Sequence, residues 1–146
     1  MSVFIDLYSR SVVGWDLSAS LERHSMIHAF QKALWRRLPP SGLLVHSDRG
    51  VQYASSDYLK LLSKNGFVQS MSRKGDCWDN AVAESFFHTL KMQLLYHHKF
   101  ACKRDTEQAL FNYIEVYSNR RRRHSTKDYK SPALYEMEWE SLRNAA

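Results

Sequence analysis

The sequence has few cysteines and no long apolar run. Its two cysteines, Cys77 and Cys102, stand far apart among 146 residues, so they form no disulfide framework of the kind found in small secreted domains. No apolar stretch reaches the roughly 20 residues that a membrane-spanning helix needs. The first residues lack the basic region and apolar stretch of a secretory signal. We therefore expect a soluble, cytoplasmic protein with no membrane partner.

The charged residues favour one sign. Twenty-one Lys and Arg stand against fifteen Asp and Glu, which gives a net charge of +6 at pH 7. A surplus of this kind attracts polyanions, and nucleic acid is the leading candidate. Charge alone does not decide the matter, because many basic proteins bind no nucleic acid.

Hydrophobic periodicity predicts strands first, and then strands that alternate with helices. This order is typical of an α/β domain around a mixed sheet, and the length suits a single domain, residues 1–146, with a helical C-terminal extension at 105–146. Tyr113 and Tyr117 fall on the apolar side of that extension, where core packing is their simplest role. The expected strands are residues 3–7, 11–17, 43–45 and a short one from 67; the expected helices are 21–37, 56–64, 79–95, one capped by Asp105 or Thr106, and one from Pro132.

Two carboxylates occupy positions that suit a metal site. Asp48 follows the predicted strand that ends near residue 45, and functional groups gather at the carboxyl ends of strands in open α/β sheets. At 100° per residue, Glu84 falls on a polar stripe of its helix, which consists of Asn80, Glu84, His88 and Lys91. Such a pair can converge on Mg²⁺, which takes oxygen ligands and serves phosphoryl transfer. The same residue types also occur as turn residues and solvated charges, so spacing alone leaves the site open.

The residues around these acids resemble the signature blocks of insertion-sequence transposases. The blocks run from His46 to Tyr53, from Ser70 to Ala81, from Glu84 to Phe87, and from Tyr117 to His124 followed by Ser131-Pro132. Thirty-five residues, 49 to 83, separate Asp48 from Glu84, as in the Asp-Asp-35-Glu pattern of this family and of retroviral integrases. The hairpin at residues 5–15 is similar too, so the resemblance covers nearly the whole chain.

The resemblance implies a ribonuclease-H-like integrase core, with a mixed sheet flanked by helices, and metal-dependent DNA chemistry. Asp48 and Glu84 would bind Mg²⁺ or Mn²⁺, and DNA would be cleaved and joined at transposon ends. Lys91 matches a basic position of the family pattern and would contact the terminal DNA. The expected partners are transposon and target DNA and further copies of the chain, assembled on that DNA in a bacterial cytoplasm.

The family pattern has three acids, and the first lies on a strand that precedes the early hairpin. This sequence begins at that hairpin, and neither Asp6 nor Asp16 matches the first acid by its surrounding motif. We therefore expect the chain to lack the first strand and to be inactive alone. The alternative to a transposase fragment is a catalytically inactive remnant that binds DNA or pairs with full-length transposase and inhibits it.

Basic residues near the acidic pair and after the fourth helix are the predicted DNA contacts. Contacts to phosphates give affinity and salt dependence rather than sequence choice. The arginine run from residue 120 also complements a helix dipole, so that run has a local alternative. The predicted DNA-binding residues are Lys91, Arg49, Arg73, Lys74, Asn80, Arg120, Arg121, Arg122 and Arg123.

Overall fold

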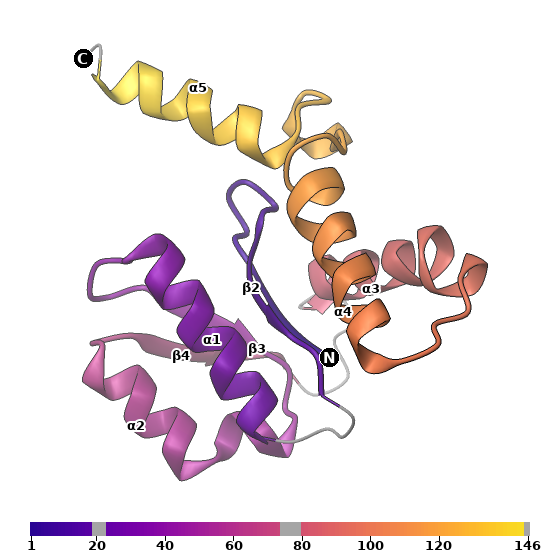
Figure 1. Ribbon diagram of the computed structural model, residues 1–146. Helices are drawn as coiled ribbons and strands as arrows, with labels where there is room; N and C mark the ends of the chain where they lie inside the picture. Colours follow the sequence, from indigo (N-terminus) through magenta and orange to yellow (C-terminus); the bar gives the residue numbers. More distant parts are fainter. Residues whose placement is uncertain (19–22, 74–79, 145–146) are drawn as a thin grey trace. The chain divides into compact units, whose positions relative to one another are not determined.

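The computed structural model describes residues 1–18, 23–73 and 80–144 (Figure 1). The predicted helix starts at residues 21 and 79 and the predicted DNA contact Lys74 lie outside these residues. The strands are β1 (Ser2–Ile5), β2 (Val12–Asp16), β3 (Leu44–Ser47) and β4 (Val68–Met71). The helices are α1 (Arg23–Arg37), α2 (Ser56–Lys64), α3 (Ala81–Gln93), α4 (Lys103–Phe111) and α5 (Pro132–Asn144), with the short helices η1 (Val51–Ala54), η3 (Leu95–His97) and η5 (Ser125–Lys127) and the π-helix η4 (Asn112–Ser118) between them.

The strands pair two and two. In the described residues, β1 pairs with β2 and β3 pairs with β4, so they form two small sheets rather than one continuous mixed sheet. The β3–β4 pair is parallel, in a register that runs from Leu44 opposite Val68 to Ser47 opposite Met71. Parallel neighbours need a crossover connection, and α2 provides it. The predicted α/β class is confirmed, and β3 extends to the residue before Asp48.

The chain forms two compact units. Unit 1 consists of Met1–Phe4 and Gly14–Phe87, and unit 2 consists of Ile5–Val13 and His88–Ala146. The open end of the β1–β2 hairpin therefore belongs to unit 1 and its tip to unit 2, and α3 begins in unit 1 and continues into unit 2. The interpretation of the chain as one core with an extension from residue 105 stays a prediction.

The core of unit 1 is built from α1, α2 and β3 (Figure 1). Aromatic rings meet edge to face there: the ring centroid of Phe30 lies 5.5 Å from that of Tyr58 and 6.2 Å from that of Phe67. Contacts of this kind add about 0.5–1.5 kcal/mol beyond the area that they bury. The core fixes β3, and so the point at which the chain leaves the sheet. Its buried members are Met26, Phe30, Val45, Tyr58, Leu62 and Phe67.

Helix α2 ends in a glycine turn that leads the chain into β4. Gly66 has φ +67°, a left-handed conformation that favours glycine. The Phe67 N–H donates to the Leu62 carbonyl and the Gly66 N–H to the Ser63 carbonyl, each at 3.0 Å. These two bonds define a Schellman cap, which satisfies carbonyls at the helix end. The helix spans Ser56–Lys64, the bounds that the sequence predicts.

A buried amide holds the hairpin within unit 2. The Asn119 side chain accepts the Val12 N–H and donates to the Val12 carbonyl, both at 2.9 Å. A neighbouring strand bonds an edge through the same two backbone groups. Asn119 therefore takes the place of a strand at this residue of β2.

Helix α5 contacts the hairpin tip through aromatic rings. The ring centroid of Tyr8 lies 5.1 Å from that of Tyr135 and 5.9 Å from that of Trp139. The Lys127 ammonium stands over both tyrosine rings, 5.4 Å from the centroid of Tyr8 and 4.9 Å from that of Tyr135. Since α5 begins at Pro132, as predicted from Ser131-Pro132, these contacts place its first turns against the hairpin.

Two predictions for the region after residue 100 are wrong. Helix α4 begins at Lys103 with Cys102 as its cap, not at Asp105 or Thr106; the Thr106 hydroxyl instead donates to the Cys102 carbonyl at 3.2 Å. Tyr117 is 40% exposed and is not a core residue, whereas Tyr113 is buried as predicted. The α-helical spacing used for Tyr117 fails because residues 112–118 form a π-helix, which has more residues per turn.

Candidate functional site

Asp48 stands at the end of β3, where the sequence predicts a functional carboxylate. It is exposed and directly follows the strand. Its Oδ1 accepts the N–H of Gly50 at 2.8 Å, a local bond that turns the chain away from the sheet. The carboxylate is thus held by its own loop while it stays open to solvent.

A polar network behind Asp48 ties the ends of β3 and β4 together. The two ring nitrogens of His46 lie 2.9 Å from the Ser70 hydroxyl and 3.1 Å from the Ser72 hydroxyl. The Ser72 N–H donates to the Ser47 carbonyl at 2.9 Å. This network fixes the strand from which Asp48 emerges. His46 is not assigned this role in the sequence analysis; its place on the predicted strand end, two residues before Asp48, is the signal that points to it.

Arg49 lies beside the same network. Its Nε donates to the Ser72 carbonyl at 2.9 Å, so a β4 residue orients a guanidinium that follows Asp48 directly in the chain. Arg73 comes next after Ser72 and is exposed. The structure therefore brings two of the predicted DNA contacts, Arg49 and Arg73, to the strand ends where Asp48 stands.

The charge of Asp48 acts on a neighbouring tyrosine. Burial raises the pKa of Tyr53, and the negative charge of Asp48 raises it further, while a hydrogen bond from Gln52 opposes both. Tyr53 lies on η1, directly after the loop. The hydroxyl of Tyr53 consequently stays neutral at physiological pH, next to the carboxylate.

Glu84 lies in the first turn of α3. The helix has the two faces that the sequence predicts: Phe86 and Leu90 are buried, whereas Glu84, His88 and Lys91 are exposed. A carboxylate in the first turn also complements the helix dipole, which gives Glu84 a local role besides any metal binding.

The donor atoms of Asp48 and Glu84 suit a hard divalent cation. Both side chains offer exposed carboxylate oxygens, the ligand type that Mg²⁺ prefers. Across residues 1–18, 23–73 and 80–144, no three His, Cys, Asp or Glu side chains come together in a way that could hold a metal ion.

The arginine run follows the π-helix in unit 2. The N–H groups of Arg121 and Arg122 both donate to the Tyr117 carbonyl at 2.8 Å, so the run closes the helix end. Arg122 also donates a guanidinium N–H to the Thr89 hydroxyl at 3.1 Å, whereas Arg120, Arg121 and Arg123 are exposed. Only Arg122 has a side-chain bond that ties it into the fold.

The two remaining predicted DNA contacts belong to α3 or its start. Asn80 directly precedes the helix and is half-buried, and Lys91 lies near its C-terminal end and is exposed. Lys91 follows Glu84 by seven residues, which is two helical turns, so both side chains stand on one face of α3.

Comparison with known families agrees with this arrangement. A family model described as "Integrase core domain" matches residues 1–77, and a second model with the same description matches residues 65–132. The chain belongs to the integrase core domain family. Its resemblance to insertion-sequence transposases of the integrase superfamily is confirmed by its relatives.

Transposase InsF for insertion sequence IS3A, from Escherichia coli K12, is 44% identical over 136 residues, which are 93% of this chain and 47% of that protein. The transposase for insertion sequence element IS904, from Lactococcus lactis subsp. lactis IL1403, is 43% identical over 136 residues, which are 93% of this chain and 54% of that protein. This integrase core chain thus spans about half the length of the curated relatives it matches.

A solved structure supports the fold independently. The catalytic core domain of HTLV-2 integrase, in complex with magnesium and in a trimeric form, superposes with a TM-score of 0.63 at 16% identity, covering 91% of this chain and 81% of that one. The predicted ribonuclease-H-like fold of the integrase core is confirmed. In the described residues, no helix is both long and apolar enough to cross a membrane.

Proposed function

We propose that this integrase core chain takes part in DNA transposition, with Asp48 and Glu84 as ligands of Mg²⁺ or Mn²⁺. The observation that carries the proposal is the pair itself, in a chain of this family. Thirty-five residues separate the two acids, both are exposed, and they stand at a strand end and in the first turn of a helix. When bound, the metal stabilises charge on the attacking and leaving oxygens of an in-line displacement at phosphorus.

The residues around the pair then have defined tasks. The His46 network and the bond from Gly50 hold Asp48 in place, while Arg49 and Arg73 bind DNA phosphates. Lys91 contacts DNA on the same helix face as Glu84. The supported reaction has two steps: water opens a phosphodiester to free a 3′ hydroxyl, and that hydroxyl attacks a second phosphodiester, so one bond forms as another breaks and no ATP is needed.

We further propose that the chain works as part of a larger assembly. Its relatives are about twice as long, and the family pattern requires a third acid. A full-length transposase in that assembly would contribute a complete set of acids. The assembly would act on transposon ends and target DNA in a bacterial cytoplasm.

Strand transfer measured on labelled transposon-end DNA tests the proposal. The chain is assayed with Mg²⁺ or Mn²⁺, alone and joined to the part of the E. coli transposase outside the 136 matched residues. The joined protein should form transfer products, and Glu84→Gln should abolish them. Asp105→Asn is the matched control, because Asp105 is also an exposed acid in a helix first turn, and it should leave joining intact. Equal loss with both substitutions, or joining that survives Glu84→Gln, would contradict the assigned site.

A second candidate function is DNA binding without catalysis, in which the chain inhibits full-length transposase. It is favoured by the two-carboxylate site and by the exposed arginines 120, 121 and 123. Under this alternative the joined protein forms no product, while the chain alone binds DNA, co-purifies with the full-length enzyme and lowers its rate.

A further inference from the structure

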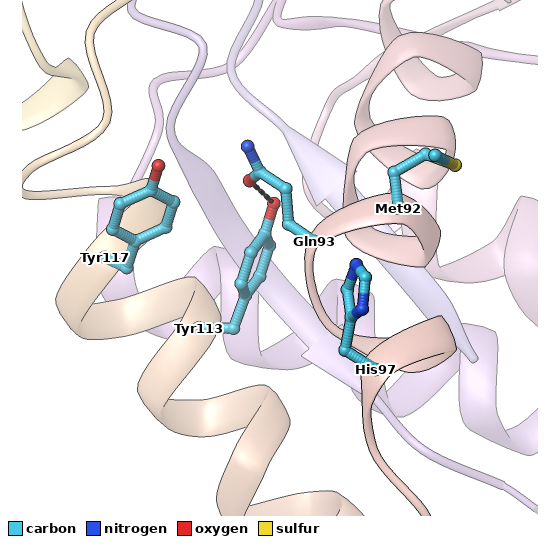
Figure 2. Close-up of a pocket in the computed structure, with 5 residues that line it drawn as sticks. All are labelled: Met92, Gln93, His97, Tyr113 and Tyr117. Carbon is cyan, nitrogen blue, oxygen red and sulfur yellow. Dashed lines mark hydrogen bonds between the residues drawn. The ribbon is translucent and has the colours of Figure 1, made fainter.

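Unit 2 contains a pocket that none of the predicted functions uses. It has a volume of about 490 Å³, within the range of roughly 300–1,000 Å³ that is typical of small-molecule sites. Figure 2 shows the five lining side chains, which come from the end of α3, from η3 and from the π-helix: Met92, Gln93, His97, Tyr113 and Tyr117.

The π-helix creates this pocket. It places two rings of its own, Tyr113 and Tyr117, with centroids 5.6 Å apart and planes inclined by 46°. The first ring is buried and the second is 40% exposed, so Tyr117 offers a ring face at the rim. Stretches of π-helix occur frequently at functional sites.

The back of the pocket is polar. The Tyr113 hydroxyl donates to Oε1 of Gln93 at 2.9 Å (Figure 2). This bond fixes the amide and leaves its NH₂ group as a donor, with no hydrogen bond to the described residues. None of the five lining residues is acidic. A planar ligand with hydrogen-bond acceptors on its edge matches these groups.

Two cations of unit 2, Lys91 and Arg122, lie on or contact α3, the helix whose end lines the pocket. Lys91 precedes the lining residue Met92 on α3 and is exposed. Arg122 reaches α3 through its bond to the Thr89 hydroxyl. Burial raises the pKa of Tyr113, and the positive charge of Arg122 opposes this rise. A ligand here would meet positive charge beside an aromatic wall.

We propose that this pocket binds one unstacked nucleobase of the DNA. Tyr117 would stack on the base, Gln93 would donate to an acceptor on its edge, and Lys91 and Arg122 would contact the flanking phosphates. Bases gain about 1–3 kcal/mol by stacking on an aromatic side chain, and any base offers a ring face. The inference rests on the proposed binding of DNA and adds the site at which one base leaves the helix stack.

The test measures affinity for two duplexes of the same sequence, one fully paired and one with a single unpaired 2-aminopurine. The full chain should prefer the unpaired base. Tyr117→Ala should reduce that preference about 5- to 150-fold, the equivalent of the stacking energy, and should leave the fluorescence of the unpaired base unquenched. Tyr117→Phe keeps the ring and should keep the preference. Tyr96→Ala is the matched control, since Tyr96 is also an exposed tyrosine, 69% accessible, and does not line the pocket.

Three results would overturn the inference. If Tyr117→Ala leaves the preference for the unpaired duplex unchanged, the base does not bind in this pocket. Loss with Tyr96→Ala as large as with Tyr117→Ala would reduce the effect to general surface binding. If Tyr117→Ala lowers the molecular mass of the protein measured without DNA and leaves its DNA preference unchanged, the pocket is a contact between copies of the chain. Failure of the wild-type chain to bind either duplex would instead count against the proposed function itself.

Discussion

The loop after β3 and the block after the π-helix contain similar sequence motifs, but their residues have different roles in the structure. Both belong to blocks that resemble the transposase signature, and both combine arginines with a polar residue. In the first, Asp48 is exposed, and its side-chain hydrogen bond goes to Gly50 in its own loop. In the second, Asn119 is buried and bonds both backbone groups of Val12, 107 residues away in the chain.

This difference distinguishes candidate catalytic residues from structural residues within one family pattern. A residue that is exposed and locally held is available to a ligand, whereas a buried residue whose hydrogen bonds are all made inside the fold is not. Asp48 meets the first description and Asn119 the second. Burial and bonding partners, rather than membership in a motif, therefore decide which motif residues are candidates for catalysis.

The largest expected effect belongs to Asp48. Asp48→Asn should lower strand transfer by the joined protein about 10⁴-fold, the scale on which an aspartate-to-asparagine change in a catalytic triad lowers kcat. The asparagine Oδ1 can still accept the Gly50 N–H, so the thermal midpoint should not change. A metal-dependent transfer assay and a melting curve, measured on the same preparation, test the expected loss of activity and the expected constant midpoint. A lowered thermal midpoint would assign Asp48 a structural role instead.

Asn119 should show the opposite behaviour. Asn119→Ala removes two buried hydrogen bonds to the backbone of Val12, which should lower the free energy of unfolding by about 2–4 kcal/mol. Asn112→Ala is the control, because Asn112 is an exposed asparagine in the π-helix that ends just before Asn119 and its loss should have little effect. Urea unfolding of the three proteins measures the difference. Equal urea midpoints for Asn119→Ala and the wild type would show that the two hydrogen bonds between Asn119 and Val12 add no stability.

The sequence could predict the first region because its signals are local. An apolar run that ends at a polar residue places Asp48 after β3, and the Asn65-Gly66 pair marks the end of α2. The faces of α3 also follow from spacing along one helix, with Phe86 buried and Glu84 exposed. Each of these features depends on neighbours within a few residues, which is the range that periodicity describes.

The second region could not be predicted in the same way. The bond between Asn119 and Val12 depends on pairing across nearly the whole chain, and no local pattern encodes it. The exposure of Tyr117 depends on a π-helix, which breaks the α-helical spacing on which the prediction relied. The pocket at Tyr113 and Gln93 brings together residues 20 apart in the chain, so it too appears only after folding.

A smaller effect should separate Arg49 from an ordinary surface cation. If Arg49 binds a DNA phosphate, Arg49→Gln should weaken DNA binding and lower the slope of log affinity against log salt by about 0.9. Lys103→Met is the control, since Lys103 is already paired with Glu107, Nζ to Oε1 at 3.5 Å, and should leave the slope unchanged. Anisotropy titrations at several salt concentrations give the slopes. The same reduction in both variants would mean that Arg49 contributes only net charge.

The smallest effect concerns His124, the last residue of the second block. Partial burial lowers the pKa of its imidazole, and the charges of Arg122, Arg10 and Lys127 lower it further. The unfolded chain, with an ordinary histidine pKa near 6.5, therefore binds the proton more readily than the folded protein. Stability from the neutral ring is present above about pH 6.5 and is lost as the pH falls through the window below it.

His124→Gln should flatten this loss in urea unfolding between pH 7.5 and pH 5, without changing joining at neutral pH. The loss will be small, because the ring is only partly buried and solvent screens its charge. If stability falls with pH as steeply in His124→Gln as in the wild type, the three cations do not act on stability through His124. Asn119 would then be the residue of this block with a structural role.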